Sequence, residues 1–220
     1  MSMNNERRIL IMTSVAAEKE AILKGIGQTS SIDVVLAGVG PISAGIQTTK
    51  ALLTKDYDLV INMGIAGGFQ NKADVGTLVI ADEMISGDLG AESPEGFITL
   101  DELGFGASTR IKADSELVMH CLTSLKLAEV PVQLGHVLTL STVTGTSETT
   151  KNLQDREPDA LAEAMEGYGV ALAAQEFGKP VLEIRSISNP IGPRDRSSWR
   201  MKEAFDTLER ASKVIAEVLL

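Results

Sequence analysis

Acidic side chains stand at two places in the chain where they could meet a substrate. Glu166 lies between Met165 and Gly167, just before an expected helix, and a carboxylate can accept two hydroxyl hydrogen bonds from the diol of a sugar. Glu18 and Glu20 follow the first apolar run. Because helical residues two apart point to nearly opposite faces, at most one of these two can face a site. The alternative for all three is an ordinary solvated acid at a helix start, which the helix macrodipole favours.

Two glycine-rich segments follow the next apolar runs and would let a ligand approach the backbone closely. The first is Gly38-Val39-Gly40, which opens an expected helix, and the second is the segment 62–68, which contains Gly64 and two further glycines. Their spacing matches neither the dinucleotide fingerprint nor a P-loop, which needs Gly-Lys-Ser/Thr. The two segments therefore indicate either a backbone-lined pocket or simple tight turns.

A last group of polar residues follows the apolar run 181–188. This expected strand carries Arg185 and brings Asn189 to its carboxyl end, although an asparagine before Pro190 can simply start a turn. The segment 194–200 is a local cationic cluster in an acidic protein. It is either a solvated helix start or a site that holds an anion.

The elements that must position these groups alternate along the chain between apolar runs and helical patterns. We expect strands over 9–12, 32–37, 59–63, 77–85, 137–140 and 181–188, and helices over 16–24, 41–54, 116–128, 167–177 and 198–220. This alternation predicts an α/β sandwich around a largely parallel sheet, in a single domain over residues 1–220. Ligands of such sheets bind beyond the carboxyl ends of the strands. The segment 87–110 is expected to leave the sheet, as long excursions that cover sites do.

Composition excludes several other classes of function. The chain has 220 residues with 20 Lys+Arg against 30 Asp+Glu, a net charge of −10, which argues against nucleic acid and anionic membranes as partners. No apolar stretch has the length of a membrane span or a signal-peptide core. The single cysteine, Cys121, excludes an intrachain disulfide and fits the cytoplasm. His120 and His136 lack a zinc-ligand spacing, so no metal site is expected.

Taken in order along one α/β chain, these segments resemble the nucleoside phosphorylase/nucleosidase superfamily. The resemblance runs from about Ile9 to the C-terminal helix. The matching segments are Gly38-Val39-Gly40, Asn62-Met63-Gly64-Ile65-Ala66-Gly67-Gly68, Ala164-Met165-Glu166 and Ile184-Arg185-Ser186-Ile187-Ser188-Asn189. Within the superfamily the chain is most similar to the futalosine hydrolase family, through Thr13-Ser14-Val15-Ala16-Ala17-Glu18, Gly87-Asp88-Leu89-Gly90-Ala91-Glu92, Asp101-Glu102-Leu103-Gly104-Phe105-Gly106 and Gly192-Pro193-Arg194-Asp195-Arg196. The resemblance implies a three-layer αβα sandwich with a mixed, largely parallel central sheet.

The chemistry that this resemblance implies is cleavage of an N-ribosidic bond through a transition state like a ribosyl oxocarbenium ion. Phosphorylases of the superfamily hold phosphate with basic and hydroxyl groups early in the chain, whereas nucleosidases hold and activate water with a glutamate there. The corresponding turn of this chain has no arginine, and a carboxylate would repel phosphate, so we expect water as the nucleophile. Counting from the first strand assigns the role to Glu18, which is the assignment we favour, whereas aligning on the following apolar residues would assign it to Glu20.

The same resemblance implies residues that bind the sugar and the base. Glu166 matches the glutamate that binds the ribose hydroxyls, with Met165 packed against the sugar. Asn189 stands where nucleosidases acting on adenine nucleosides usually carry an aspartate that protonates N7. Asparagine supplies no proton, but its amide donates to N7 or O6, and members that handle 6-oxopurines favour it. The other residues expected to bind substrate are Val39, Gly64 and Arg185.

We therefore expect hydrolysis of futalosine to hypoxanthine and dehypoxanthine futalosine, a step of the alternative menaquinone pathway. A methylthioadenosine/adenosylhomocysteine nucleosidase and a purine nucleoside phosphorylase are the alternatives. No metal or organic cofactor is expected, because water, an acid and hydrogen-bond donors suffice for the reaction.

Two expectations concern the substrate tail and the assembly. Futalosine carries a benzoate on its ribose, and its carboxylate needs a positive partner, for which the candidates are Arg194, Arg196 and Arg200. Trp199 or Phe105 is expected near the benzoate ring.

The superfamily forms homo-oligomers in which a neighbouring subunit often lends an aromatic side chain to the site. We expect a dimer or a higher homo-oligomer, with Phe105 as a candidate for that lent residue.

Overall fold

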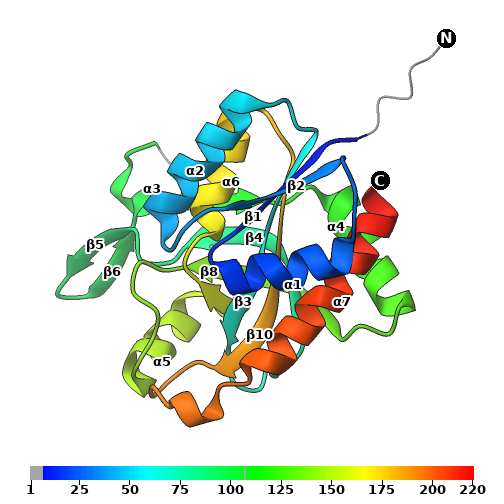
Figure 1. Ribbon diagram of the computed structural model, residues 1–220. Helices are drawn as coiled ribbons and strands as arrows, with labels where there is room; N and C mark the ends of the chain where they lie inside the picture. The colour runs from blue at the N-terminus through cyan, green and yellow to red at the C-terminus, as the bar shows by residue number, and fades with distance from the viewer. Residues whose placement is uncertain (1–6, 107) are drawn as a thin grey trace.

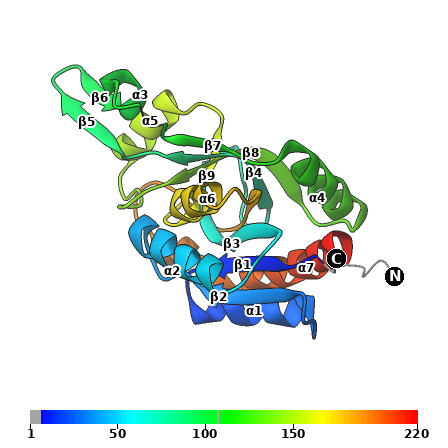
Figure 2. The ribbon, with the colours of Figure 1, turned by 90° about the horizontal axis from the view of Figure 1, so that it is seen from above.

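The computed structural model describes residues 7–106 and 108–220. Over these residues the chain forms a mixed eight-stranded sheet with helices on both faces, and a separate two-stranded hairpin (Figures 1 and 2). The strands of the sheet are β1 (Ile9–Thr13), β2 (Ile32–Leu36), β3 (Leu59–Gly68), β4 (Leu78–Ser86), β7 (Arg110–Lys112), β8 (Val132–Thr139), β9 (Ala160–Ala164) and β10 (Val181–Pro190). The predicted three-layer α/β sandwich with a mixed sheet is confirmed.

Strand β3 organises the sheet. It runs parallel to β1 and β10 and antiparallel to β9. Strand β10 also pairs antiparallel with β4, β4 runs parallel to β8, and β8 runs parallel to β9. Strands β3, β10, β4, β8 and β9 therefore close into a ring, from which β1 and β2 extend as parallel neighbours. The carboxyl ends of β1, β3 and β10 consequently meet at one edge of the sheet.

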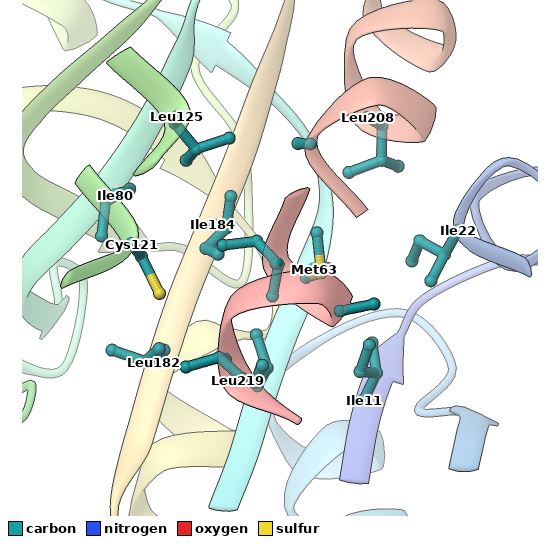
Figure 3. Close-up of a cluster of buried hydrophobic side chains, with 14 of the residues drawn as sticks. Ile11, Ile22, Met63, Ile80, Cys121, Leu125, Leu182, Ile184, Leu208 and Leu219 are labelled. Carbon is teal, nitrogen blue, oxygen red and sulfur yellow. The ribbon is translucent and has the colours of Figure 1, made fainter. Parts of the chain in front are cut away.

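Strand β1, which is buried along its whole length, shows why helices cover both faces of the sheet. Ile9 and Ile11 belong to the buried cluster that includes side chains of α1 (Ala16–Ile26), α4 (Ser115–Leu127) and α7 (Met201–Leu219), whereas Leu10 and Met12 belong to the cluster that includes side chains of α2 (Pro41–Thr54) and α6 (Gly167–Glu176). Alternate strand residues point to opposite faces, so a continuous apolar run needs both layers. Figure 3 shows the first layer, where strand side chains such as Ile11 and Ile184 lie in one cluster with Leu208 and Leu219 of α7. Among the residues described, no helix is long and apolar enough to cross a membrane.

The segment after β4 leaves the body of the molecule, as predicted. Strands β5 (Gly90–Ser93) and β6 (Gly96–Thr99) form an antiparallel hairpin that projects from the sandwich in both views (Figures 1 and 2). The short helix α3 (Leu100–Leu103) follows, and β7 then returns the chain to β4.

The sequence patterns missed two elements near the site and misplaced one helix start. Strand β9 has the sequence Ala-Leu-Ala-Glu-Ala, which favours helix, and it is a strand because β3 and β8 pair with it. Helix α5 (Ser147–Arg156) buries only Leu153 and so lacks an apolar stripe. Helix α7 begins at Met201 rather than at residue 198, because Asp195 accepts from the backbone of Ser197 and starts a separate 3-10 turn.

Candidate active site

A cavity of about 300 Å³ lies beyond the carboxyl ends of β1, β3 and β10, beside the start of α6. Residues from distant parts of the chain converge on it, as the parallel strands require. The residues predicted for the site that line this cavity are Glu18, Val39, Met165, Glu166, Asn189 and Arg194. Gly64 and Arg185 contact these lining residues from within the sheet, and Arg196 does not line the cavity.

Glu18 lies in the first turn of α1 and is only 2% exposed. Its Oε2 accepts hydrogen bonds from the hydroxyl of Thr13 (3.0 Å) and from the backbone N–H groups of Ser14 (2.9 Å) and Val15 (3.1 Å). Its Oε1 accepts from the backbone N–H of Ile65, at 2.9 Å, on strand β3. Glu20 is exposed, so Glu18 is the acid of this pair that lies at the cavity.

Gly64 makes room for the two charged groups beside it. A Cβ atom on this residue would lie 2.5 Å from Oε1 of Glu18 and 2.9 Å from Nη1 of Arg185. Both distances are too short for a real side chain, so the glycine allows the carboxylate and the guanidinium to approach the β3 backbone.

Arg185 is fully buried and ties together the acids under the cavity. Its Nε donates to Oε1 of Glu183 at 2.8 Å, and its Nη2 donates to Oε2 of Glu166 at 3.3 Å. Burial opposes the charge of Arg185, but Glu183, Glu166 and Glu18 outweigh it and raise its pKa above the ordinary value. Arg185 therefore meets acids rather than the open part of the cavity, and its place is beneath the site.

Glu183 was not predicted from the sequence. It is fully buried, and burial raises its pKa, although Arg185 and the side chain of Asn62 oppose the shift. A Cβ atom on Gly167 would lie 2.1 Å from its Oε2, so the first residue of α6 has no room for a side chain. An acid inside an apolar strand, two residues before Arg185, was the one available signal.

Glu166 precedes α6 and is 4% exposed. Besides the bond from Arg185, its Oε1 accepts from the backbone N–H of Gly40 at 3.3 Å. Gly40 has a φ of +92°, a conformation that favours glycine. The turn before α2 therefore brings a backbone donor to the carboxylate and places the neighbouring Val39 in the cavity lining.

Asn189 is the residue before the last one of strand β10, and its amide is hydrogen-bonded by its two neighbours in the chain. Its Oδ1 accepts from the hydroxyl of Ser188 at 2.9 Å, and its Nδ2 donates to the carbonyl of Pro190 at 3.0 Å. An amide nitrogen has two hydrogens, so one remains for a ligand. Asn189 therefore faces the cavity as a donor.

Glu163 is a cavity residue that the prediction left out. It is 4% exposed, and its Oε1 accepts from the backbone N–H (3.0 Å) and the hydroxyl (2.9 Å) of Thr144. Burial raises its pKa to about 7, against the two Thr144 bonds that lower it. Side chains two residues apart in a strand point to the same face. A strand predicted at β9 would therefore have placed Glu163 on the same face as Met165.

The cationic cluster reaches the cavity through one arginine. Arg194 lines the cavity, and its guanidinium lies 5.3 Å from the ring centroid of Trp199, which also lines it. Arg200 donates to the backbone carbonyls of Ser197 and Trp199 instead. Within residues 7–106 and 108–220, no three His, Cys, Asp or Glu side chains form a group that could hold a metal ion.

Comparisons with known proteins show the family and the fold of this chain. A family model described as Phosphorylase superfamily matches residues 17–220. A futalosine hydrolase of Streptomyces coelicolor is 40% identical, with 96% of each chain covered, and one of Acidothermus cellulolyticus is 41% identical over 92% of this chain and 87% of its own. The fold matches a 5'-methylthioadenosine/S-adenosylhomocysteine nucleosidase of Neisseria meningitidis with a TM-score of 0.82 at 19% identity, covering 96% of this chain and 98% of that one. The chain belongs to the futalosine hydrolase family of the phosphorylase superfamily.

Proposed function

We propose that this chain hydrolyses the N-ribosidic bond of futalosine and releases hypoxanthine and dehypoxanthine futalosine. The observation that supports this most is the convergence of two buried carboxylates, Glu18 and Glu166, with the amide of Asn189 on one cavity. Carboxylates favour the positive charge that develops on a ribosyl group, and an amide donor can bind the departing base. The 40% identity to a futalosine hydrolase supports the choice of substrate.

Glu18 holds and activates the water. Its Oε2 already accepts three hydrogen bonds, whereas Oε1 accepts one from Ile65 and has capacity for another. The water oxygen attacks C1′ and gives a proton to Glu18, while the C1′–N9 bond breaks and its electron pair leaves with the base. Phosphate at the same place would face this carboxylate and be repelled.

Glu166 binds the ribose hydroxyls and favours the cationic sugar. Arg185 and the N–H of Gly40 hold its two oxygens without exhausting their lone pairs. Met165, beside it in the lining, packs against the sugar. The ion pair beneath the site keeps the carboxylate in place while charge develops above it.

Asn189 stabilises the leaving base through its free amide hydrogen. It donates to N7 or O6 of hypoxanthine, and the base takes its proton from solvent, because an amide supplies none. Arg194 meets the carboxylate of the benzoate tail, with the ring beside Trp199, since both residues line the cavity.

Incubation with futalosine, inosine and methylthioadenosine, each with and without phosphate, tests the proposal. Chromatography of the released bases should show hypoxanthine from futalosine in phosphate-free buffer. Turnover that requires phosphate would select a nucleoside phosphorylase instead, and adenine from methylthioadenosine alone would select a methylthioadenosine nucleosidase.

The chain assembles as a dimer or higher homo-oligomer through the α2 and α6 face. An apolar groove of about 670 Å³ lies there, lined by Ile42, Ile46, Leu89 and Leu172 among others. Large apolar surface of this kind marks interfaces. Phe105, which is 72% exposed on the excursion, remains the candidate for a side chain lent to a neighbour. Light scattering should give at least twice the chain mass of 23.4 kDa, and Ile42→Asp should lower it to one chain; a monomeric wild-type protein would contradict the proposal.

A further inference from the structure

Glu163 lines the cavity, and one oxygen of its carboxylate is buried without a hydrogen-bond partner. Thr144 holds Oε1 with two donors, as described above, but Oε2 is buried and accepts no hydrogen bond. A buried acceptor without a partner destabilises the folded protein, and such groups call for an explanation. An unsatisfied oxygen in a substrate cavity indicates a donor that arrives with the substrate.

Glu163 and Asn189 lie on the two sides of one glycine. Gly67 of β3 pairs with Glu163 of β9 on one side and with Asn189 of β10 on the other. A Cβ atom on Gly67 would lie 3.5 Å from Cγ of Glu163 and 3.4 Å from Nδ2 of Asn189. Both side chains therefore lie beside Gly67, one as an acceptor and the other as a donor, together with Ile191, whose Cγ2 lies 2.5 Å from the same Cβ position.

The two purine bases present opposite patterns to such a pair. A 6-oxopurine has an acceptor at O6 and a donor at N1–H beside it. A 6-aminopurine has a donor at the amino group and an acceptor at N1. An acceptor fixed beside N1 therefore pairs with the N1–H of the first pattern, whereas it meets the lone pair of N1 in the second.

We propose that Oε2 of Glu163 accepts the N1–H of hypoxanthine while Asn189 donates to its O6 or N7, so that Glu163 selects 6-oxopurine against 6-aminopurine substrates. The inference rests on the proposed hydrolysis of futalosine and assigns its base specificity to a residue outside the motifs. A third donor at this carboxylate also favours its ionised form.

Glu163→Gln reverses the hydrogen-bonding sense at the contact. The two Thr144 donors keep the amide oxygen on their side, so the NH₂ group takes the place of Oε2 and donates toward N1. We expect kcat/KM for futalosine to fall about 10–100-fold, the loss of a hydrogen bond to a charged group. The value for the 6-amino counterpart of futalosine should stay unchanged or rise. Glu217→Gln, the same change on the exposed face of α7, should leave both values unchanged.

The ratio of the kcat/KM values for the two substrates separates a role of Glu163 in specificity from a purely structural role. Equal losses for both substrates, or no loss for futalosine, would overturn the role of Glu163. Wild-type protein that releases no base from futalosine would instead overturn the proposed function.

Base binding to the wild-type protein gives a second test, independent of turnover and of the folding of the variant. Calorimetry should show hypoxanthine binding at least about 10-fold more tightly than 1-methylhypoxanthine, which lacks the N1–H donor. Equal affinities would overturn the inference.

Discussion

Arg185 and Glu166 form an ion pair under the cavity, with Nη2 of the arginine 3.3 Å from Oε2 of the glutamate and neither side chain more than 5% exposed. The same guanidinium binds Glu183 at 2.8 Å. One buried cation thus compensates a group of acids in an acidic protein. This arrangement explains how the carboxylates of Glu18 and Glu166 can remain beside a substrate cavity.

Loss of this cation should unfold the protein more readily. Arg185→Met leaves Glu166 and Glu183 buried without their partner, and breaking a buried pair in this way costs about 3–5 kcal/mol. Urea unfolding measures the effect. Lys202→Met, which breaks the exposed pair with Asp206, is the control and should change the free energy of unfolding far less. Similar losses in the two variants would contradict a structural role for the buried arginine.

Replacement of Glu18, the proposed general base, should lower kcat. Glu18→Gln keeps the shape of the side chain but accepts no proton, so kcat for futalosine should fall about 10²–10⁴-fold with a smaller change in KM. Glu20→Gln alters the exposed acid two residues away and should leave kcat unchanged. If the second variant loses activity and the first does not, the choice between the two acids is wrong.

A methyl group at Gly64 should disturb both charged residues at once. The Cβ of Gly64→Ala would lie 2.5 Å from Oε1 of Glu18 and 2.9 Å from Nη1 of Arg185. Because misplaced catalytic groups cost on the order of 10²-fold, kcat should fall by about that factor. Gly145→Ala, where a Cβ meets nothing within 4 Å, is the matched control. Full activity of Gly64→Ala would show that the close approach is not needed.

The stability of the protein should depend on pH through Glu163. Burial raises its folded pKa to about 7 from an ordinary 4.5. Between these values the folded chain holds a proton that the unfolded chain has lost, so the free energy of unfolding falls as pH rises through this window. The full difference is about 3 kcal/mol.

Urea unfolding at pH 5 and pH 8 measures this dependence. Wild type should lose stability between these values relative to Glu163→Gln, which cannot titrate. Parallel behaviour of the two proteins would contradict the raised pKa.

Replacement of an arginine that lines the cavity from the cationic cluster, residues 194–200, should weaken the binding of futalosine. Arg194→Ala should raise KM for futalosine about 10-fold, because Arg194 lines the cavity and would lose a charge-assisted contact with the tail. Arg196→Ala should change KM less, since that residue does not line the cavity. Initial rates over a range of futalosine concentrations give both values. No loss of kcat/KM when Arg194, Arg196 and Arg200 are all replaced would exclude the cluster from tail binding.

The sequence predicted the positions of strands whose apolar runs fill both core layers, such as β1, and the bounds of α2, whose proline starts it. It also placed Glu18 and Asn189 at the cavity, because Glu18 lies in the first turn of the helix after β1 and Asn189 lies at the carboxyl end of β10. It missed β9, where tertiary pairing overrides the preference of alanine for helix. Because that strand was not predicted, Glu163 was not predicted as a cavity residue either. No sequence pattern shows that Arg185 turns to Glu183 and Glu166, since the contact depends on where distant strands meet.

The sugar product formed in phosphate buffer tests the central claim, that water held by Glu18 cleaves futalosine, most directly. Mass spectrometry of the reaction should show free dehypoxanthine futalosine, one for each hypoxanthine released, and no faster turnover than in phosphate-free buffer. A phosphorylated sugar, formed at a rate that rises with phosphate concentration, would contradict the account.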